Sequence, residues 1–185
     1  MQVKFNSIID ALKTAKTVLY PTDTVWGLGC DATNEEAVKK IYKLKDREES
    51  KSLIILVSSV EMLEDYIENI PPKALEILKN VEKPTTVIYK NPRGLAPNTI
   101  ASDNTIAIRI PQDEFCIQLI KEFGKPIVST SANVSGEPTP KSFSEISQAI
   151  LKSVDYVVNL HQEKVAEKSS TILKIEGEAI IVIRE

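Results

Sequence analysis

The sequence predicts a single α/β domain built on a mixed sheet. Segments with the patterns of strands and helices alternate along most of the 185 residues, which is typical of a sheet covered by helices. The run SLIILV at 52–57 is apolar throughout, as in strands that are covered on both faces. The chain closes with two adjacent strand-like segments around EGE, and a closing hairpin adds antiparallel pairing to the sheet.

Local patterns in the first half of the chain predict four helices and three strands. Helices are expected where apolar residues recur at helical spacing after a capping residue, and strands where short apolar runs end at turn residues. The helices are expected at 6–16, 33–45, 60–67 and 71–81, and the strands at 17–21, 52–57 and 85–90. Capping-box spacing opens two of the helices, at Thr33 with Glu36 and at Ser58 with Glu61. The segment 22–32 is expected to be a loop or an irregular strand.

The second half continues the alternation after a polar, turn-rich loop at 91–104. Strands are expected at 105–111, 125–131 and 155–160, helices at 112–124 and 143–153, and a closing hairpin over 170–185. The first of these helices begins with acidic residues and ends at Gly124, as the helix dipole and C-capping favour.

The charge balance argues against a dedicated nucleic-acid coat protein. Lys and Arg number 23 against 26 Asp and Glu, a net charge of −3, and the pI is about 5.4, whereas such proteins are strongly basic. Cys30 and Cys116 form no CxxC pair and are expected to be buried thiols. The N-terminus shows no signal segment, and no apolar run approaches the ~20 residues that span a bilayer. We expect a soluble, cytoplasmic protein with no membrane partner.

Several kinds of catalytic site are disfavoured by the residues present. His161 is the only histidine, so a histidine triad would have to use it, and an exposed loop residue is the favoured interpretation. A histidine-rich metal site is impossible and no carboxylate cluster replaces it, so no protein-bound metal is expected. Neither a P-loop signature nor GxGxxG is present, and the GLG at 27–29 is equally consistent with a tight turn.

Cationic and hydroxyl side chains gather where predicted elements end. Lys39, Lys43 and Arg47 have helical i, i+4 spacing, which favours a solvated helix face. Lys45 and Arg47, however, lie where the helix ends and a buried strand begins, a place from which side chains can also enter a cleft. Arg109 and Arg184 lie in apolar strands, and the two-residue period leaves open whether they face solvent or a site. The segment STSANVSGEPTP at 129–140 adds neutral donors. The residues by themselves indicate a phosphate or carboxylate site.

Four segments, taken in order, resemble the YrdC-type threonylcarbamoyl-adenylate synthases. They are YPTDTVWGLGCDATN, KLKDREESKSLIIL, STSANVSGEPTP and SSTILKI with the later IVIR. The motifs K-x-R at Lys45 and Arg47 and S-x-N at Ser131 and Asn133 are specific when they occur together in this order. The resemblance implies a twisted mixed sheet with helices and a concave cavity, in one YrdC-like domain over 1–185 with no additional C-terminal domain.

The resemblance also implies an activity and its partners. L-threonine, bicarbonate and ATP would be joined into threonylcarbamoyl-AMP with release of pyrophosphate. Downstream proteins would transfer the threonylcarbamoyl group to an adenosine beside the anticodon of certain tRNAs, and a weak contact with tRNA or RNA is included in the expectation. Mg²⁺ would be carried by the ATP phosphates rather than by a protein cage. Such chemistry depends on alignment and neutralised charge and requires no histidine base.

Matched position by position, the resemblance assigns roles to twelve residues. The residues implied as catalytic are Lys45, Arg47, Ser131 and Asn133. ATP would be bound by Arg47, Lys51, Thr105, Ser131, Thr139 and Arg184, and L-threonine by Thr24, Arg109, Ser129 and Ser170. The chain departs from the family pattern at Glu48, where many members have Pro, and at Leu56, where some have a His near the threonine.

Rival interpretations belong to other functional classes. An RNA-binding module of the same fold without synthase activity is the main alternative, and the low pI and the aromatic content of 5% weaken it. A carbamoyl-transfer module of hydrogenase maturation would belong to a much larger chain with zinc-binding and acylphosphatase parts. A paralogue that has lost synthesis is disfavoured because K-x-R and S-x-N are intact.

Overall fold

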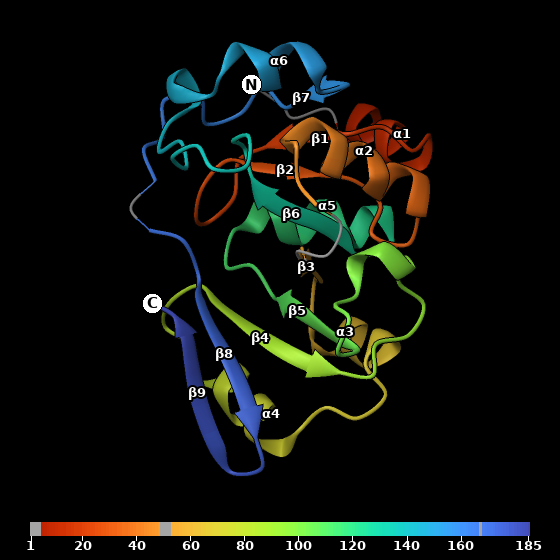
Figure 1. The fold of residues 1–185 in the computed structure, drawn as a ribbon, viewed down its shortest axis with the longest axis vertical. Coiled ribbons are helices and arrows are strands. Elements are labelled where there is room, and N and C mark those ends of the chain that lie inside the picture. Colours follow the sequence, from red (N-terminus) through yellow and green to blue (C-terminus); the bar gives the residue numbers. More distant parts are fainter. Residues whose placement is uncertain (1–4, 49–52, 167) are drawn as a thin grey trace.

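The computed structural model describes residues 5–48, 53–166 and 168–185 (Figure 1). Its strands are β1 (Val18–Tyr20), β2 (Gly27–Gly29), β3 (Ile54–Leu56), β4 (Thr85–Lys90), β5 (Thr105–Arg109), β6 (Ile127–Ser131), β7 (Tyr156–Val157), β8 (Thr171–Glu176) and β9 (Ala179–Arg184). Within the described ranges they form one sheet in the order β7-β1-β2-β6-β3-β5-β4-β8-β9. The pairs β1–β7, β3–β5 and β4–β8 are parallel and the other pairs are antiparallel. The predicted mixed α/β sheet is confirmed.

Most helices begin close to the predicted positions, but the N-caps of α2 and α3 lie one residue later than predicted. They are α1 (Phe5–Lys13), α2 (Glu35–Lys45), α3 (Val60–Tyr66), α4 (Pro72–Lys79), α5 (Glu114–Phe123) and α6 (Gln148–Ser153), with 3₁₀ turns η1 (Pro97–Thr99) and η2 (Phe143–Glu145). Asn34, not Thr33, caps α2, and Ser59, not Ser58, caps α3. The helix expected at 143–153 is two pieces because Ser147 is extended there and its hydroxyl caps α6 by accepting from Ile150 N.

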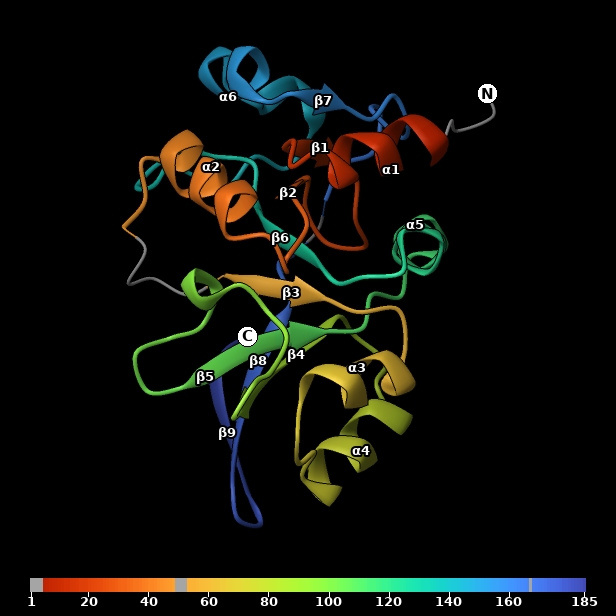
Figure 2. The same cartoon turned by 90° about the vertical axis from the view of Figure 1, so that its right-hand side faces the viewer.

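The central strands separate two apolar clusters because neighbouring residues of a strand face opposite sides of the sheet. Ile55 belongs to the cluster that includes residues of α2, whereas Leu56 belongs to the cluster formed with α1 and α5. Figure 2 shows α2 on one flank of the sheet and α1 and α5 together on the other. With helices on both flanks, the middle strands are almost wholly buried, and all five residues of β5 are.

Two glycine positions in the sheet have clear physical causes. The GLG segment is β2, so neither a phosphate loop nor a tight turn is present there. A Cβ on Gly29 would collide with the carbonyl oxygen of Val128 on the neighbouring strand β6, which no side chain could tolerate. Gly177 turns the closing hairpin with a φ of 62°, a conformation that glycine adopts without steric cost.

Candidate active site

A pocket of about 360 Å³ lies over one face of the central strands. Its floor is a row of residues from four adjacent strands, because Ser129 of β6 pairs with Ile54 of β3, Ile54 with Ala107 of β5, and Ala107 with Ile88 of β4. The floor is therefore apolar in the middle, and polar side chains stand around it. Such a cavity suits a ligand with charged groups at its periphery.

Eight of the twelve predicted site residues line this pocket. They are Thr24, Arg47, Arg109, Ser129, Ser131, Thr139, Ser170 and Arg184. Three of these side chains are arginines, and no carboxylate is among the described residues that line the pocket. The strand period left open which way Arg109 and Arg184 face, and the fold turns both toward the pocket. A cavity with this excess of positive charge favours anionic ligands.

The end of α2 explains why Lys45 and Arg47 take different directions. Asp46 follows the helix in the left-handed conformation, with φ 48° and ψ 51°. Its N–H donates to Lys43 O, and the N–H of Arg47 donates to Tyr42 O, the two bonds of a Schellman C-cap. The chain reverses at this point. Arg47 consequently reaches the pocket lining, whereas Lys45 stays buried.

Lys45 lies behind the pocket wall. Its side chain is only 2% exposed, and Nζ donates to Ser131 O at 2.5 Å and to Asn133 O at 2.7 Å. The side-chain amide of Asn133 is in turn bonded to Glu137 O at 2.8 Å. Burial, with the charge of Arg47 as a second cause, lowers the pKa of Lys45 to about 8. In this structure Lys45 and Asn133 hold the S-x-N turn in place rather than line the pocket.

The deepest polar contacts are made by Arg109 and Thr24. Arg109 is 3% exposed, and its Nη1 donates to Thr24 Oγ1 at 3.1 Å. Thr24 Oγ1 is also 3.0 Å from Thr22 Oγ1, and the Thr22 hydroxyl donates its hydrogen to Val25 O at 2.7 Å. The Thr24 hydroxyl must therefore be the donor to Thr22. Its remaining lone pair can only accept a hydrogen bond from a ligand.

The hairpin β8–β9 supplies the opposite side of the pocket. Arg184 donates through Nε and Nη2 to Ser170 O, at 3.2 and 2.9 Å. The hydroxyl of Ser170 lies 2.9 Å from that of the fully buried Thr86 on β4. Burial, and secondarily the charge of Arg109, lowers the pKa of Arg184. Thr86 carried no signal in the sequence because threonine is a common residue in strands.

Two further predicted residues differ in their standing. Thr105 is buried at the start of β5, where its hydroxyl bonds to Asp103 Oδ1 at 2.6 Å, and it does not belong to the pocket lining. Lys51 lies outside the described residues.

His161 is half exposed, 3.7 Å from Glu163, and lines a separate hollow beside α5. In the described ranges there is no group of three or more metal-ligating side chains, and no helix long and apolar enough to cross a membrane.

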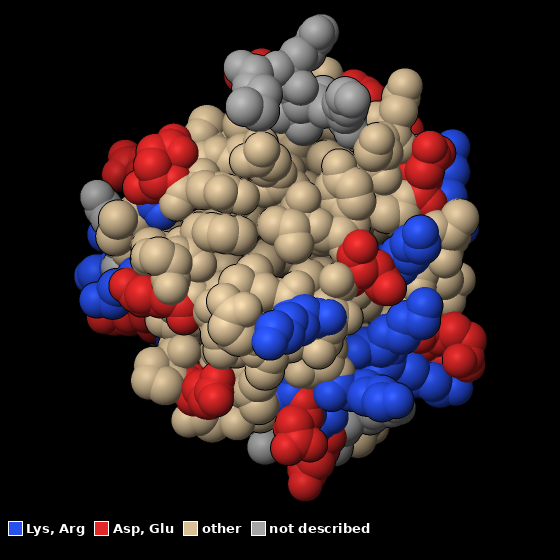
Figure 3. All heavy atoms as spheres, turned by 90° about the horizontal axis from the view of Figure 1, so that it is seen from above, with Lys and Arg blue, Asp and Glu red and all other residues tan. Residues whose placement is uncertain are grey.

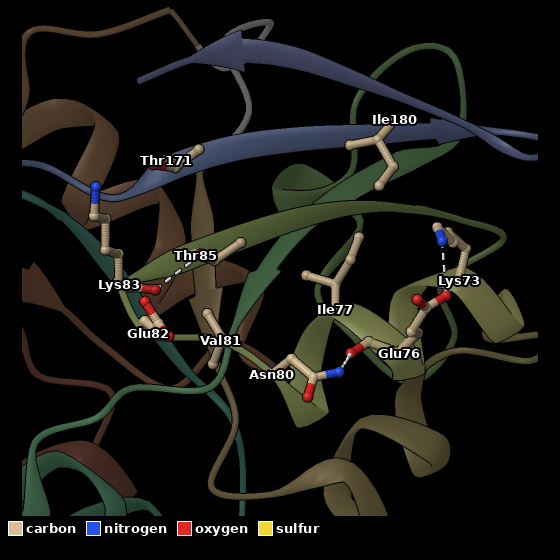
Figure 4. Close-up of a pocket in the computed structure, with 10 residues that line it drawn as sticks. All are labelled: Lys73, Glu76, Ile77, Asn80, Val81, Glu82, Lys83, Thr85, Thr171 and Ile180. Carbon is tan, nitrogen blue, oxygen red and sulfur yellow. Dashed lines mark hydrogen bonds and ion pairs between the residues drawn. The ribbon is translucent and has the colours of Figure 1, made fainter.

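A second hollow, of about 420 Å³, lies between α4 and the strands β4, β8 and β9 (Figure 4). Lys73 and Glu76 at its rim are paired with each other at 2.7 Å. Its remaining lining includes aliphatic side chains, such as Ile77 and Ile180, together with exposed polar side chains. Because its charges are already paired or exposed to solvent, this hollow lacks the convergent cations of the first pocket.

Comparison with known proteins agrees with the geometry. The model of the Sua5/YciO/YrdC family, described as telomere recombination, matches residues 10–185. The chain belongs to this family. A Methanocaldococcus jannaschii relative is 39% identical over 173 residues, covering 92% of this chain and 79% of that protein. The threonylcarbamoyl-AMP synthase of Idiomarina loihiensis is 34% identical over 152 residues, covering 80% and 81% of the two chains.

A solved structure extends the similarity to the whole fold of this Sua5/YciO/YrdC chain. The crystal structure of Pyrococcus abyssi Sua5 complexed with L-threonine matches with a TM-score of 0.87 and 28% identity. It covers 98% of this chain, while this chain spans 53% of the Sua5 chain. The sheet that carries the pocket is therefore the family fold.

Proposed function

We propose that this protein is an L-threonylcarbamoyladenylate synthase, a nucleotidyltransferase that joins L-threonine, bicarbonate and ATP. The observation that carries the proposal is the pocket with three arginines and no carboxylate among its described lining residues. The synthase names of the family relatives support it. ATP, bicarbonate and the product are anions and L-threonine carries a carboxylate, so one cationic cavity can hold them together and align the reacting atoms.

The two sides of the pocket suit different parts of the reaction. Arg109, at the deep end, would pair with the threonine carboxylate, and Thr24 would accept a hydrogen bond from its amine or hydroxyl. Arg47, with Ser131 at the other side, would meet the phosphates. Mg²⁺ would be carried by those phosphates, which fits a pocket lining without carboxylates in the described residues. Bound in this way it would neutralise part of the phosphate charge.

The reaction needs alignment more than proton transfer. A threonine carbamate, formed from the amine and dissolved carbon dioxide, would attack the α-phosphorus, and pyrophosphate would leave. Arg47 would stabilise the charge that grows on the transferring phosphate. Lys45 would act by holding the S-x-N turn that carries Ser131. The apolar floor around Ala107 would limit water near the labile carbamate.

The product points to partners outside this chain. Threonylcarbamoyl-AMP would be consumed in the cytoplasm by proteins that transfer the threonylcarbamoyl group to tRNA. The alternative, an RNA-binding module without synthesis, would need a broad basic surface. On the face shown in Figure 3, Lys and Arg gather at one side while the centre carries few charges. That face therefore offers no continuous basic groove.

The deciding experiment is pyrophosphate release with each substrate omitted in turn. We expect release to require both L-threonine and bicarbonate, with weak activity on serine, because one missing methyl costs about 1–3 kcal/mol of discrimination. Equal release without threonine, or none under any condition, would reject the synthase proposal. In that case salt-dependent retention of tRNA in a gel would test the RNA-binding alternative.

A further inference from the structure

Arg109 carries its charge almost entirely out of water. Its side chain is 3% exposed, and a buried guanidinium without a balancing charge is costly. One described carboxylate provides that balance: Asp23 Oδ1 lies 3.1 Å from Arg109 Nη1, with the Asp23 side chain 9% exposed. The contact is not aligned as a hydrogen bond, since Oδ1 has no hydrogen-bond partner among the described residues. The attraction is therefore one between charges.

Asp23 is itself held from the far side. Its other oxygen, Oδ2, accepts from the backbone N–H of Gln112 at 2.9 Å. Asp23 belongs to the connection between β1 and β2, and Gln112 to the connection between β5 and α5. The carboxylate is therefore fixed between two loops and lies outside the pocket lining, behind Arg109.

These contacts fix the orientation of the Arg109 guanidinium. Nη1 is engaged by Asp23, which lies outside the pocket lining, and by Thr24 Oγ1, which belongs to it. Nε is buried and has no hydrogen-bond partner within the described part of the chain. An unsatisfied buried donor is expensive, so it persists only where the surroundings hold the guanidinium in place. Nη2 is not enclosed in this way and has no hydrogen-bond partner among the described residues, so its N–H groups are the donors for which a ligand carboxylate has the matching acceptors.

We infer that Asp23 is a positioning residue, which fixes the Arg109 guanidinium so that its remaining donors meet the carboxylate of the amino-acid substrate. The inference rests on the proposed function for the identity of that substrate. Asp23 does not touch the ligand and takes no part in the chemical step. Its loss should therefore weaken amino-acid binding and leave ATP binding and the chemical step nearly unchanged.

The test compares Asp23→Asn with a matched control, Asp31→Asn. Asp31 is also a buried aspartate, with a backbone N–H bond from Thr33 at 2.8 Å and a lysine, Lys125, at 3.2 Å, and it does not line the pocket. The KM values for L-threonine and for ATP are measured separately by pyrophosphate release. For Asp23→Asn we expect KM for L-threonine to rise about tenfold or more, as loss of one charge-assisted contact would cause. KM for ATP and kcat should stay within about threefold.

A second readout does not depend on activity. The Nε–H signal of Arg109, assigned in the ¹⁵N spectrum through Arg109→Lys, should move or broaden in ligand-free Asp23→Asn and stay in place in Asp31→Asn. If the wild-type protein releases no pyrophosphate, the proposed function fails, and this signal still tests the positioning role. Should Asp23→Asn not fold, Asp23→Glu keeps the charge and should show the same KM split at smaller size.

Two kinetic results would overturn the inference. One is an unchanged or lowered KM for L-threonine in folded Asp23→Asn, since a lowered value would mean that Asp23 competes with the ligand. The other is a proportional change in both KM values, as a general loss of structure would cause. An undisturbed Arg109 signal in Asp23→Asn would also reject it.

Discussion

The two sides of the arginine pocket are built in different ways. The inner wall, defined as Arg47, Ser129, Ser131 and Thr139, comes from the end of α2, from β6 and from the loop after β6, and the buried Lys45 supports it from behind. The outer wall, defined as Ser169, Ser170, Ile172, Ile183 and Arg184, comes from the closing hairpin.

The two walls of the pocket differ in burial. Every residue of β9 is exposed, and Val182 and Ile183 are 53% and 54% exposed. Segments with few buried contacts open at lower free-energy cost than the core. Strand β9 is therefore the part of the pocket that can open at the lowest cost when substrates enter. Substitutions in the two walls should differ in size and in kind.

The largest effect should come from Arg47→Ala in the inner wall. If Arg47 stabilises the transferring phosphate, its loss should lower the rate by about 10²–10³, or roughly 3–4 kcal/mol. Arg47→Lys keeps the charge but not the planar fork, and should be impaired less. Single-turnover formation of threonylcarbamoyl-AMP measures the rate, and circular dichroism confirms the fold. Wild-type turnover in folded Arg47→Ala would remove the inner wall from the chemistry.

The next effect concerns stability at Lys45. Lys45→Met leaves two carbonyls of the S-x-N turn without their donor, and should lower the free energy of unfolding by about 2 kcal/mol at pH 7. The pKa of folded Lys45 is about 8, against an ordinary 10.5. Between these values the unfolded wild-type chain holds more protons than the folded one, so wild-type stability rises with pH relative to the variant.

The measurement is urea unfolding of both proteins from pH 7 to pH 10. Because other lysines and tyrosines also titrate in this window, only the difference between wild type and Lys45→Met is informative. We expect that difference to grow above pH 8. A constant difference would show that Lys45 is not desolvated behind the wall.

Arg184→Ala in the outer wall should have a smaller effect. Arg184 is bound to Ser170 O from an exposed strand, so its loss should cost about 1 kcal/mol or less in stability and about tenfold in KM for ATP. The rate at saturating ATP should change little. A loss as large as that of Arg47→Ala would mean that the two walls contribute alike, which contradicts the comparison.

The smallest effect is expected outside both walls, at His161. It lines a different hollow and is half exposed, so His161→Ala should leave turnover unchanged and stability within about 0.5 kcal/mol. The pH–rate profiles of the two proteins should coincide. A loss of about 100-fold, of the size that removing a general base causes, would make His161 catalytic.

The sequence was enough to predict the class of the fold. Local patterns suffice for this because strands and helices are recognised by the spacing of apolar residues within one segment. β4 lies where its pattern predicted, and Gly124 ends α5 with the expected left-handed φ of 76°. The ordered motifs named eight residues that the fold brings to one cavity.

The contacts among those residues follow only from the tertiary structure. The contact of Asp23 with Arg109 joins positions far apart in the chain, as do those of Lys45 with Ser131 and of Thr86 with Ser170. No local pattern carries such pairings, because they depend on which strands become neighbours. Burial then determines which of these side chains can contact a ligand. The K-x-R motif implied a catalytic role for both cations, but the left-handed turn at Asp46 places Arg47 in the pocket lining and Lys45 behind the pocket wall.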